Sequence, residues 1–324
     1  MKITLAHGSG GMATAELIDK VFAERFSNPA LDMTEDCAVV DGSKKIAVTT
    51  DSFVVTPLEY KGGDIGRLCI CGTVNDLLMR GAFPKYITCG FIIEEGMDTE
   101  QLERIASSAA DTAKEAGVAI IAGDTKVIEG KGGLYINTAG VGFVPENVNI
   151  SAALCRPGDA VVLSGNLGDH HAAILSHRMG IENDIESDNA PLVGMVSAML
   201  DAGLDIHAMR DVTRGGLGTV LNELASASNC GFEIYEDSIP VSSGTASFAA
   251  ILGLDTMHMG NEGRLVAVLP KEQAERACSI MRGCKYGENA AIIGTACEKS
   301  GVSTRIGGRR NVSALMGEGL PRIC

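Results

Sequence analysis

The sequence ends on a cysteine, Cys324, which follows Pro321-Arg322-Ile323. From about residue 305 onward the chain is rich in Gly, Arg, Ser and Asn and lacks the periodic apolar residues of a helix or a strand. A tail of about twenty residues can span up to roughly 60 Å when it is extended. We therefore expect residues 305–324 to form a mobile tail that carries the Cys324 thiol to a site on the same chain or on a neighbouring one.

A set of aspartates is spread along the sequence, at the ends of predicted strands or beside predicted loops. They are Asp36, Asp51, Asp76, Asp124 and Asp211. Mg²⁺ takes oxygen ligands and keeps several waters, so scattered carboxylates that together bind a polyphosphate suit its chemistry. The sequence therefore predicts a nucleotide triphosphate site held by magnesium bridges.

Glycine-rich loops precede two of the predicted helices. The first, which includes Gly8, Gly10 and Gly11, lies ahead of a helix predicted to begin at Thr14, and the second is Arg214-Gly215-Gly216. Free N–H groups and the helix dipole make such loops anion sites, to which Lys126 and Arg214 add positive charge. The sequence has neither G-x-x-x-x-G-K-[ST] nor the H-R-D and D-F-G motifs of protein kinases, so the predicted site belongs to neither of those classes.

The elements that must position these residues alternate between strands and helices. Asp51 stands at the end of one strand, and Asp124 and Asp211 follow the ends of two others, whereas Asp76 lies in an otherwise apolar helix. The strands expected around these residues are an opening strand before His7 and strands at 37–40, 46–52, 86–93, 118–122, 133–144 and 206–209; the helices are at 64–81, 99–116 and 219–228.

Length and composition limit the possible architectures. At 324 residues the chain exceeds the size at which one hydrophobic core usually stops growing, so we expect an α/β fold in two domains, 1–150 and 151–304, followed by the tail. The formal net charge of −14 argues against binding to nucleic acid or to anionic membranes. The sequence has no signal-peptide pattern and no apolar run of about 20 residues, which predicts a soluble, cytoplasmic protein.

Cysteine and histidine pairs could indicate a different kind of metal site. In a cytosolic chain of this length, however, most of the ten cysteines are expected to be reduced and to pack in the core. Cys69 with Cys71, and His170 with His171, fall within predicted helices, where residues at these spacings point in different directions. We therefore predict structural roles for both pairs.

Taken together, these motifs resemble a known family. HGSGG, TTDSFVVTPL, GGDIGRLCICGTVNDLLMRGA, GDTKV, MRDVTRGGLGTVLNELA, GNEGR and the terminal PRIC, which together extend over the whole chain, are similar to the hydrogenase maturation carbamoyl dehydratases of the HypE family. That family lies within the ATP-binding superfamily with the aminoimidazole ribonucleotide synthetase (PurM-like) fold. The terminal cysteine is the most specific part of the resemblance, since the selenophosphate synthetases and thiamine monophosphate kinases of the superfamily lack such a tail.

The resemblance implies a fold and an activity. The N-terminal domain is expected to pair its sheet with that of a second subunit in a dimeric barrel, and the C-terminal domain to be a mixed sheet with helices. A carbamoyltransferase of the HypF type would load a carboxamide onto Cys324. The chain would then dehydrate it with ATP and Mg²⁺ to a thiocyanate, which supplies cyanide to the iron of a [NiFe] hydrogenase through a HypC–HypD-type complex.

The resemblance also assigns residues. It implies that Glu262 of GNEG and Lys126 of GDTK act on Cys324, with Glu262 favoured as the base and Lys126 either a base or a phosphate contact. Nucleotide contacts are expected from Gly8, Gly10, Gly11, Asp51, Asp124, Thr125, Arg214 and Asn261, and metal contacts from Asp36, Asp76 and Asp211. The alternatives are a nucleotide-gated scaffold for maturation partners and a small-molecule kinase of the thiamine monophosphate kinase type.

Overall fold

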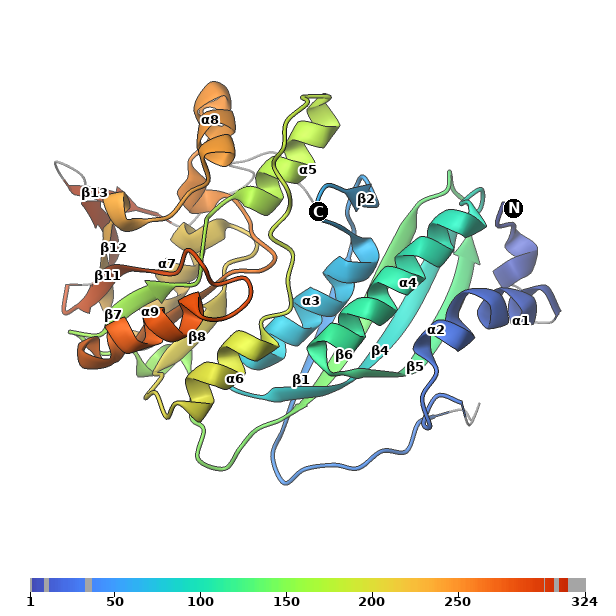
Figure 1. Ribbon diagram of the computed structural model, residues 1–324, viewed down its shortest axis with the longest axis horizontal. Coiled ribbons are helices and arrows are strands. Elements are labelled where there is room, and N and C mark those ends of the chain that lie inside the picture. Colours follow the sequence, from blue (N-terminus) through green and yellow to red (C-terminus); the bar gives the residue numbers. More distant parts are fainter. Residues whose placement is uncertain (1, 9–11, 33–36, 300, 306–308, 314–324) are drawn as a thin grey trace.

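A computed structural model of the chain describes residues 2–8, 12–32, 37–299, 301–305 and 309–313, and it forms two α/β halves. In the first half, the described strands form a four-stranded sheet in the order β1-β6-β4-β5, with β4 and β5 parallel and the other pairs antiparallel. Two helices cover one face of this sheet (Figure 1). The elements are β1 (Ile46–Phe53), α3 (Ile65–Leu78), β4 (Phe83–Glu94), α4 (Thr99–Ala116), β5 (Ala119–Ile128) and β6 (Leu134–Phe143).

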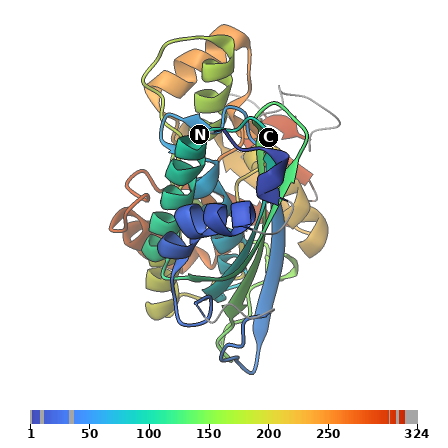
Figure 2. The same cartoon turned by 90° about the vertical axis from the view of Figure 1, so that its right-hand side faces the viewer.

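Short elements complete the first half. A small hairpin precedes α3, and a continuous helical segment at the N-terminus packs beside α4, as Figure 2 shows in dark blue. They are β2 (Glu59–Tyr60), β3 (Gly63–Asp64), a 3₁₀ turn (Leu5–Gly8), α1 (Met12–Ile18), a π-helical stretch (Asp19–Ala23) and α2 (Glu24–Phe26).

The two long helices of the first half begin where local chemistry predicts, although α3 ends at Leu78 and not at residue 81 as expected. The Asp64 side chain accepts a hydrogen bond from the Arg67 N–H at the start of α3, and Asp98 accepts one from the Glu100 N–H at the start of α4. Gly117 ends α4 in the left-handed conformation, with φ 70°. The expected helix 99–116 is therefore confirmed to the residue.

The second half contains a mixed sheet. Its described strands follow the order β13-β12-β9-β11-β7-β10-β8, in which only β9 and β12 pair in parallel. The strands are β7 (Ala160–Leu163), β8 (Ala208–Asp211), β9 (Gly231–Tyr235), β10 (Leu265–Leu269), β11 (Ala291–Cys297), β12 (Gly301–Arg305) and β13 (Arg309–Val312), and the helices are α5 (Asp169–Met179), α6 (Val193–Asp201), α7 (Gly216–Ser228), α8 (Ser243–Leu252) and α9 (Ala274–Arg282).

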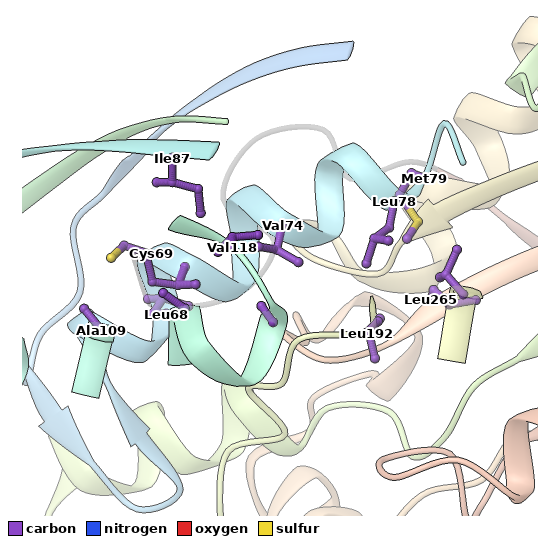
Figure 3. Close-up of a cluster of buried hydrophobic side chains, with 14 of the residues drawn as sticks. Leu68, Cys69, Val74, Leu78, Met79, Ile87, Ala109, Val118, Leu192 and Leu265 are labelled. Carbon is purple, nitrogen blue, oxygen red and sulfur yellow. The ribbon is translucent and has the colours of Figure 1, made fainter. Parts of the chain in front are cut away.

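One hydrophobic cluster joins the halves. Leu68, Cys69 and Val74 of α3 belong to the same buried cluster as Leu192 and Leu265 of the second half (Figure 3). Burial of apolar side chains contributes about 25 cal/mol for each Å² removed from water, so a shared cluster opposes separation of the halves. The cluster thereby fixes the position of α3 against β8 and β10, where the candidate site lies.

Several expected elements differ in the structure. Residues 37–40 form no strand, and residues 5–8 form a 3₁₀ turn rather than following an opening strand. The strand expected to end at residue 122 continues as β5 to Ile128, because residues 123–128 pair in parallel with β4. Residues 309–312, where no regular structure was expected, form the edge strand β13, since backbone pairing with β12 needs no apolar pattern.

Among the described residues, every helix is too short or too polar to cross a bilayer.

Candidate active site

A cavity of about 610 Å³ opens between the two halves. The first half lines it with β1 and α3, and the second half with the end of β8, the following loop and Glu262. Of the residues predicted for the site, it brings together Asp51, Asp76, Asp211, Arg214 and Glu262. Residues separated by up to about two thirds of the sequence thus line one cavity.

Three carboxylates of the cavity are held close enough to influence one another. The Thr73 hydroxyl donates to Asp51 Oδ2 at 3.3 Å, and the Thr49 hydroxyl donates to Asp76 Oδ2 at 2.8 Å. Burial, and then the neighbouring Asp76, raise the pKa of Asp51 to about 6 and that of Asp211 to about 6. Burial also raises the pKa of Asp76. This concentration of negative charge would be relieved by a bound cation.

The donor set is consistent with magnesium but does not form a complete protein cage. Among the described residues, no three His, Cys, Asp or Glu side chains are grouped as ligands of one ion. Mg²⁺ commonly binds through one or two carboxylates and takes its remaining ligands from water and substrate phosphates. Asp76 and Asp211 could therefore hold the ion only together with a nucleotide.

Glu262 faces the carboxylates from the loop before β10. Burial raises the pKa of Glu262 well above its usual range, and Asp211, Asp188 and Asp51 add to the effect, in that order. Arg214 acts in the opposite direction. A carboxylate with increased proton affinity at the wall of a cavity is a candidate general base.

Arginines supply the positive charge of the cavity. Arg214, which was predicted, is joined by Arg80 and Arg210, which were not. Arg80 Nε donates to the Ile150 carbonyl at 2.8 Å, and Arg210 pairs with Glu223. The only sequence signal for them was proximity: Arg80 lies near Asp76 in the predicted helix 64–81, and Arg210 directly precedes Asp211.

A second group of predicted residues lies on β5, away from this cavity. Asp124, Thr125 and Lys126 belong to β5, whereas Asp51 belongs to β1, and these strands form opposite edges of the four-stranded sheet. Three strand spacings separate the two edges, or roughly 14 Å. Lys126 Nζ lies 3.0 Å from Asp124 Oδ1, and 62% of the Lys126 side chain is exposed.

The remaining predicted residues have other positions. A Cβ on Gly8 would come within 2.7 Å of Val127 Cβ, so this glycine allows the N-terminal segment to pack against β5. Asn261 is fully buried and does not line the cavity. Its Oδ1 accepts from the Gly168 N–H at 2.7 Å, and its Nδ2 donates to the Val212 and Met259 carbonyls, so this side chain connects three loops. Gly10, Gly11, Asp36 and Cys324 lie outside the described residues.

Comparisons with known proteins show the family of the chain. Residues 34–144 match the N-terminal domain of the AIR synthase related proteins, and residues 156–307 match their C-terminal domain. The chain is 46% identical to carbamoyl dehydratase HypE of Azotobacter vinelandii over 331 residues, which cover 99% of this chain and 97% of that protein. It is 41% identical to carbamoyl dehydratase HypE of Escherichia coli K12, with 99% of each chain covered.

Solved structures lead to the same family. A HypE crystal structure in complex with ATP superposes with a TM-score of 0.94 at 42% identity, covering 99% of both chains. A structure of a HypE–HypF complex gives a TM-score of 0.81 at 44% identity, covering 92% of this chain and 99% of that one. A thiamine-monophosphate kinase of Stenotrophomonas maltophilia gives 0.73 at 21% identity, which is a likeness of fold alone and does not favour the kinase alternative. The chain therefore belongs to the HypE family of carbamoyl dehydratases, which act in hydrogenase maturation and have the two-domain PurM-like fold.

Proposed function

We propose that this chain uses ATP to dehydrate a carboxamide carried on the Cys324 sulfur, and so produces the thiocyanate that supplies cyanide to the iron of a [NiFe] hydrogenase. The observation that carries the proposal is the cavity, where a candidate base, three aspartates and arginines meet in a chain that matches HypE proteins over its full length. The described fold and these matches extend over both halves, and we place the domain boundaries near residues 150 and 305.

The chemistry explains why these residue types are needed. An amide oxygen cannot leave as oxide, so ATP must first transfer its γ-phosphoryl group to that oxygen, which releases ADP and a proton. Loss of phosphate from the resulting imidate, with removal of the remaining N–H proton, leaves the nitrile on sulfur. Arginine side chains stabilise the charge on the transferring group. A magnesium ion held by Asp76 and Asp211, with Asp36 as a further candidate ligand, would neutralise charge on the phosphates.

Glu262 is the better candidate for removing the nitrogen protons. It lines the cavity, and its surroundings raise its proton affinity. A lysine accepts a proton only where burial or neighbouring cations disfavour its charged form. Lys126 is instead exposed and paired with Asp124, so we assign it to phosphate contact.

We further propose that the chain works as a homodimer. The face of the first sheet that is turned away from α3 and α4 carries exposed Ile46 and Val48, with 53% and 65% exposure, and the rings of Tyr86 and Phe143 meet edge to face with their centroids 6.0 Å apart. Two such faces could close a barrel between subunits. This arrangement would also allow the β5 residues of one subunit to approach the cavity of the other.

The dimer can be tested with one substitution on this face. Val48→Glu places a charge in the proposed apolar interface, and we expect the dimer dissociation constant to rise at least about tenfold, which corresponds to about 1.4 kcal/mol. Sedimentation equilibrium measures it. Ile251→Glu, which alters an 80% exposed aliphatic residue on α8, serves as the matched control and should leave the dimer unchanged. An unaffected Val48→Glu dimer would place the interface elsewhere.

Partners and location follow from the same chemistry. We propose that a HypF-type carbamoyltransferase loads Cys324 and that a HypC–HypD-type complex receives the cyanide. The HypE–HypF complex among the similar structures supports the first of these partners. We place these reactions in the cytoplasm, since the cysteines that the structure describes are all unpaired thiols, as a reducing compartment would keep them.

The direct test is the mass of the C-terminal peptide. Carbamoylated protein incubated with ATP and magnesium should lose one water from the peptide that contains Cys324, and omission of magnesium should prevent the loss. An unchanged mass in protein that has bound ATP would instead favour a nucleotide-gated scaffold.

A further inference from the structure

Residues 187–192, which we call the strap, connect the two halves beside the active site. The strap is the part of the extended chain between α5 and α6 that runs past α3 in Figure 1. Five hydrogen bonds attach it to the first half: Ser187 N to the Lys61 carbonyl, Arg67 Nε to the Asn189 carbonyl, Asn189 Nδ2 to the Tyr60 hydroxyl, Asn75 Nδ2 to the Ala190 carbonyl, and Leu192 N to Asn75 Oδ1. All six residues of the strap are buried, although three of them are polar.

One of these polar residues, Asp188, points at the loop that carries Glu262. Asp188 Oδ1 accepts a hydrogen bond from the Glu262 N–H at 3.0 Å, and its Oδ2 lies 3.3 Å from Arg264 Nε. The Asp188 side chain is 0% exposed. A fully buried carboxylate is costly unless it is paired, so these two contacts have to be maintained in the folded chain.

The carbonyl group of Glu262 is also held, by one hydrogen bond from α3 and one from the strap. The Glu262 carbonyl accepts from Asn75 Nδ2 at 3.4 Å and from the Ala190 N–H at 3.4 Å. Next to it, a Cβ on Gly263 would come within 1.9 Å of the Asp188 carbonyl oxygen, so only glycine permits this approach. The backbone of Glu262 is therefore fixed at both its N–H and its carbonyl, and α3 carries Asp76 directly after Asn75.

We propose that Asp188 and Asn75 are positioning residues that hold the Glu262 side chain over the cavity. The inference rests on the proposed role of Glu262 as the base. Neither residue lines the cavity, so each would act through the Glu262 backbone and not by touching the substrate, while the Asp188 charge also raises the pKa of Glu262. Because Asn75 belongs to the first half and Asp188 to the second, correct placement of Glu262 also depends on the two halves being joined.

A double-mutant cycle in the single-turnover dehydration rate tests the proposal. Asp188→Ala should slow dehydration by about 30- to 100-fold, because misplacement of a catalytic group by about 1 Å costs on this order. Its ATP dissociation constant should stay within about threefold of the wild-type value, about 0.6 kcal/mol. Asp188→Asn, whose amide oxygen can accept the same hydrogen bond, should recover most of the rate. The variant with both Asp188→Ala and Glu262→Gln should be no slower than Glu262→Gln alone, since the two residues act as one unit.

Controls separate positioning from simple loss of stability. Asp169→Ala removes another buried carboxylate, which accepts hydrogen bonds from Ser242 and Thr245 and does not line the cavity. It should lower the unfolding temperature without slowing dehydration below the unfolding range. If Asp188→Ala fails to fold, the double-mutant cycle is measured with Asn75→Ala and Glu262→Gln. The same absence of a further rate loss in the double variant is then expected.

The outcomes also distinguish this inference from the proposed function. Additive losses in the double variant, or a parallel loss of ATP affinity in Asp188→Ala, would overturn the positioning role while leaving Glu262 as the base. Full activity of Glu262→Gln would overturn the base itself. Wild-type protein that never loses water would overturn the proposed function, whatever the variants of the strap do.

Discussion

Cys324→Ala is expected to abolish thiocyanate formation and to leave ATP binding unchanged. The carboxamide is attached through sulfur, so a chain without this thiol has nothing to dehydrate. The described residues that line the cavity lie between positions 47 and 262, far from the substitution in the sequence. Mass analysis of the C-terminal peptide after exposure to the loading partner and ATP should show no adduct, while calorimetry should give an ATP dissociation constant within about twofold of the wild-type value, about 0.4 kcal/mol.

A second cysteine provides the matched control for this prediction. Cys37 is an exposed free thiol that does not line the cavity, so Cys37→Ala removes an accessible thiol without touching the proposed site. This variant should form thiocyanate at the wild-type rate. The prediction fails if Cys324→Ala still loses one water from a carbamoylated peptide, because the carboxamide would then be carried by another thiol. A loss of ATP binding in Cys324→Ala would show that the terminal residue belongs to the nucleotide site.

The sequence predicted the aspartates of the cavity because they follow regular elements. Asp51 lies on β1, Asp76 on α3 and Asp211 at the end of β8, and each element has an apolar pattern strong enough to be recognised from local residues alone. Burial of those patterns in one shared cluster then brings the three carboxylates together. The location of this group could therefore be inferred from the sequence, and its role in binding metal stays a prediction.

The β5 residues could not be placed in the same way. Gly123-Asp124-Thr125-Lys126 has the composition of a turn, but its backbone pairs with β4 over residues 89–92, which lie more than thirty positions earlier in the chain. Such pairing depends on the neighbouring strand and is invisible in local composition. As a result the expected loop residues lie on an edge strand, and Asp124 is separated from Asp51 by the width of the sheet.

The strap was missed for a similar reason. Ser187, Asp188 and Asn189 form a polar run with no helical or strand periodicity, which in isolation predicts an exposed loop. Their burial depends on partners as distant in sequence as Tyr60, which accepts a hydrogen bond from Asn189 Nδ2 at 3.2 Å. Asn261 shows the converse case, since its motif suggested a nucleotide contact while its side chain satisfies loop backbone groups.

Glu262→Gln is expected to block dehydration with little effect on folding or ATP binding. The amide has nearly the same shape, and the Glu262 N–H can still donate to Asp188. The amide side chain of the variant, however, cannot accept a proton at neutral pH. Loss of a general base typically lowers a rate by about 10² to 10⁴. Single-turnover measurements on carbamoylated protein should show this loss with an unchanged ATP dissociation constant.

The stability of the same variant provides an independent check. A carboxyl whose pKa is higher in the folded than in the unfolded chain destabilises the folded state once the pH rises above its unfolded pKa, and the penalty grows until the pH reaches the folded pKa. The pKa of Glu262 is raised well above its usual range by burial, so removal of its charge should leave the unfolding temperature at pH 7 equal to or above that of the wild type.

Glu94→Gln is the control with the opposite sign. Glu94 accepts hydrogen bonds from the Lys131 and Gly133 N–H groups and from the Tyr135 hydroxyl, and these lower its pKa. Its ionised form therefore stabilises the fold above its unfolded pKa, and this contribution is lost as the pH falls through the folded pKa. Glu94→Gln should lower the unfolding temperature at pH 7 without changing the dehydration rate. If Glu262→Gln instead lost stability and retained its rate, Glu262 would be a structural acid and the base would have to be sought among the β5 residues.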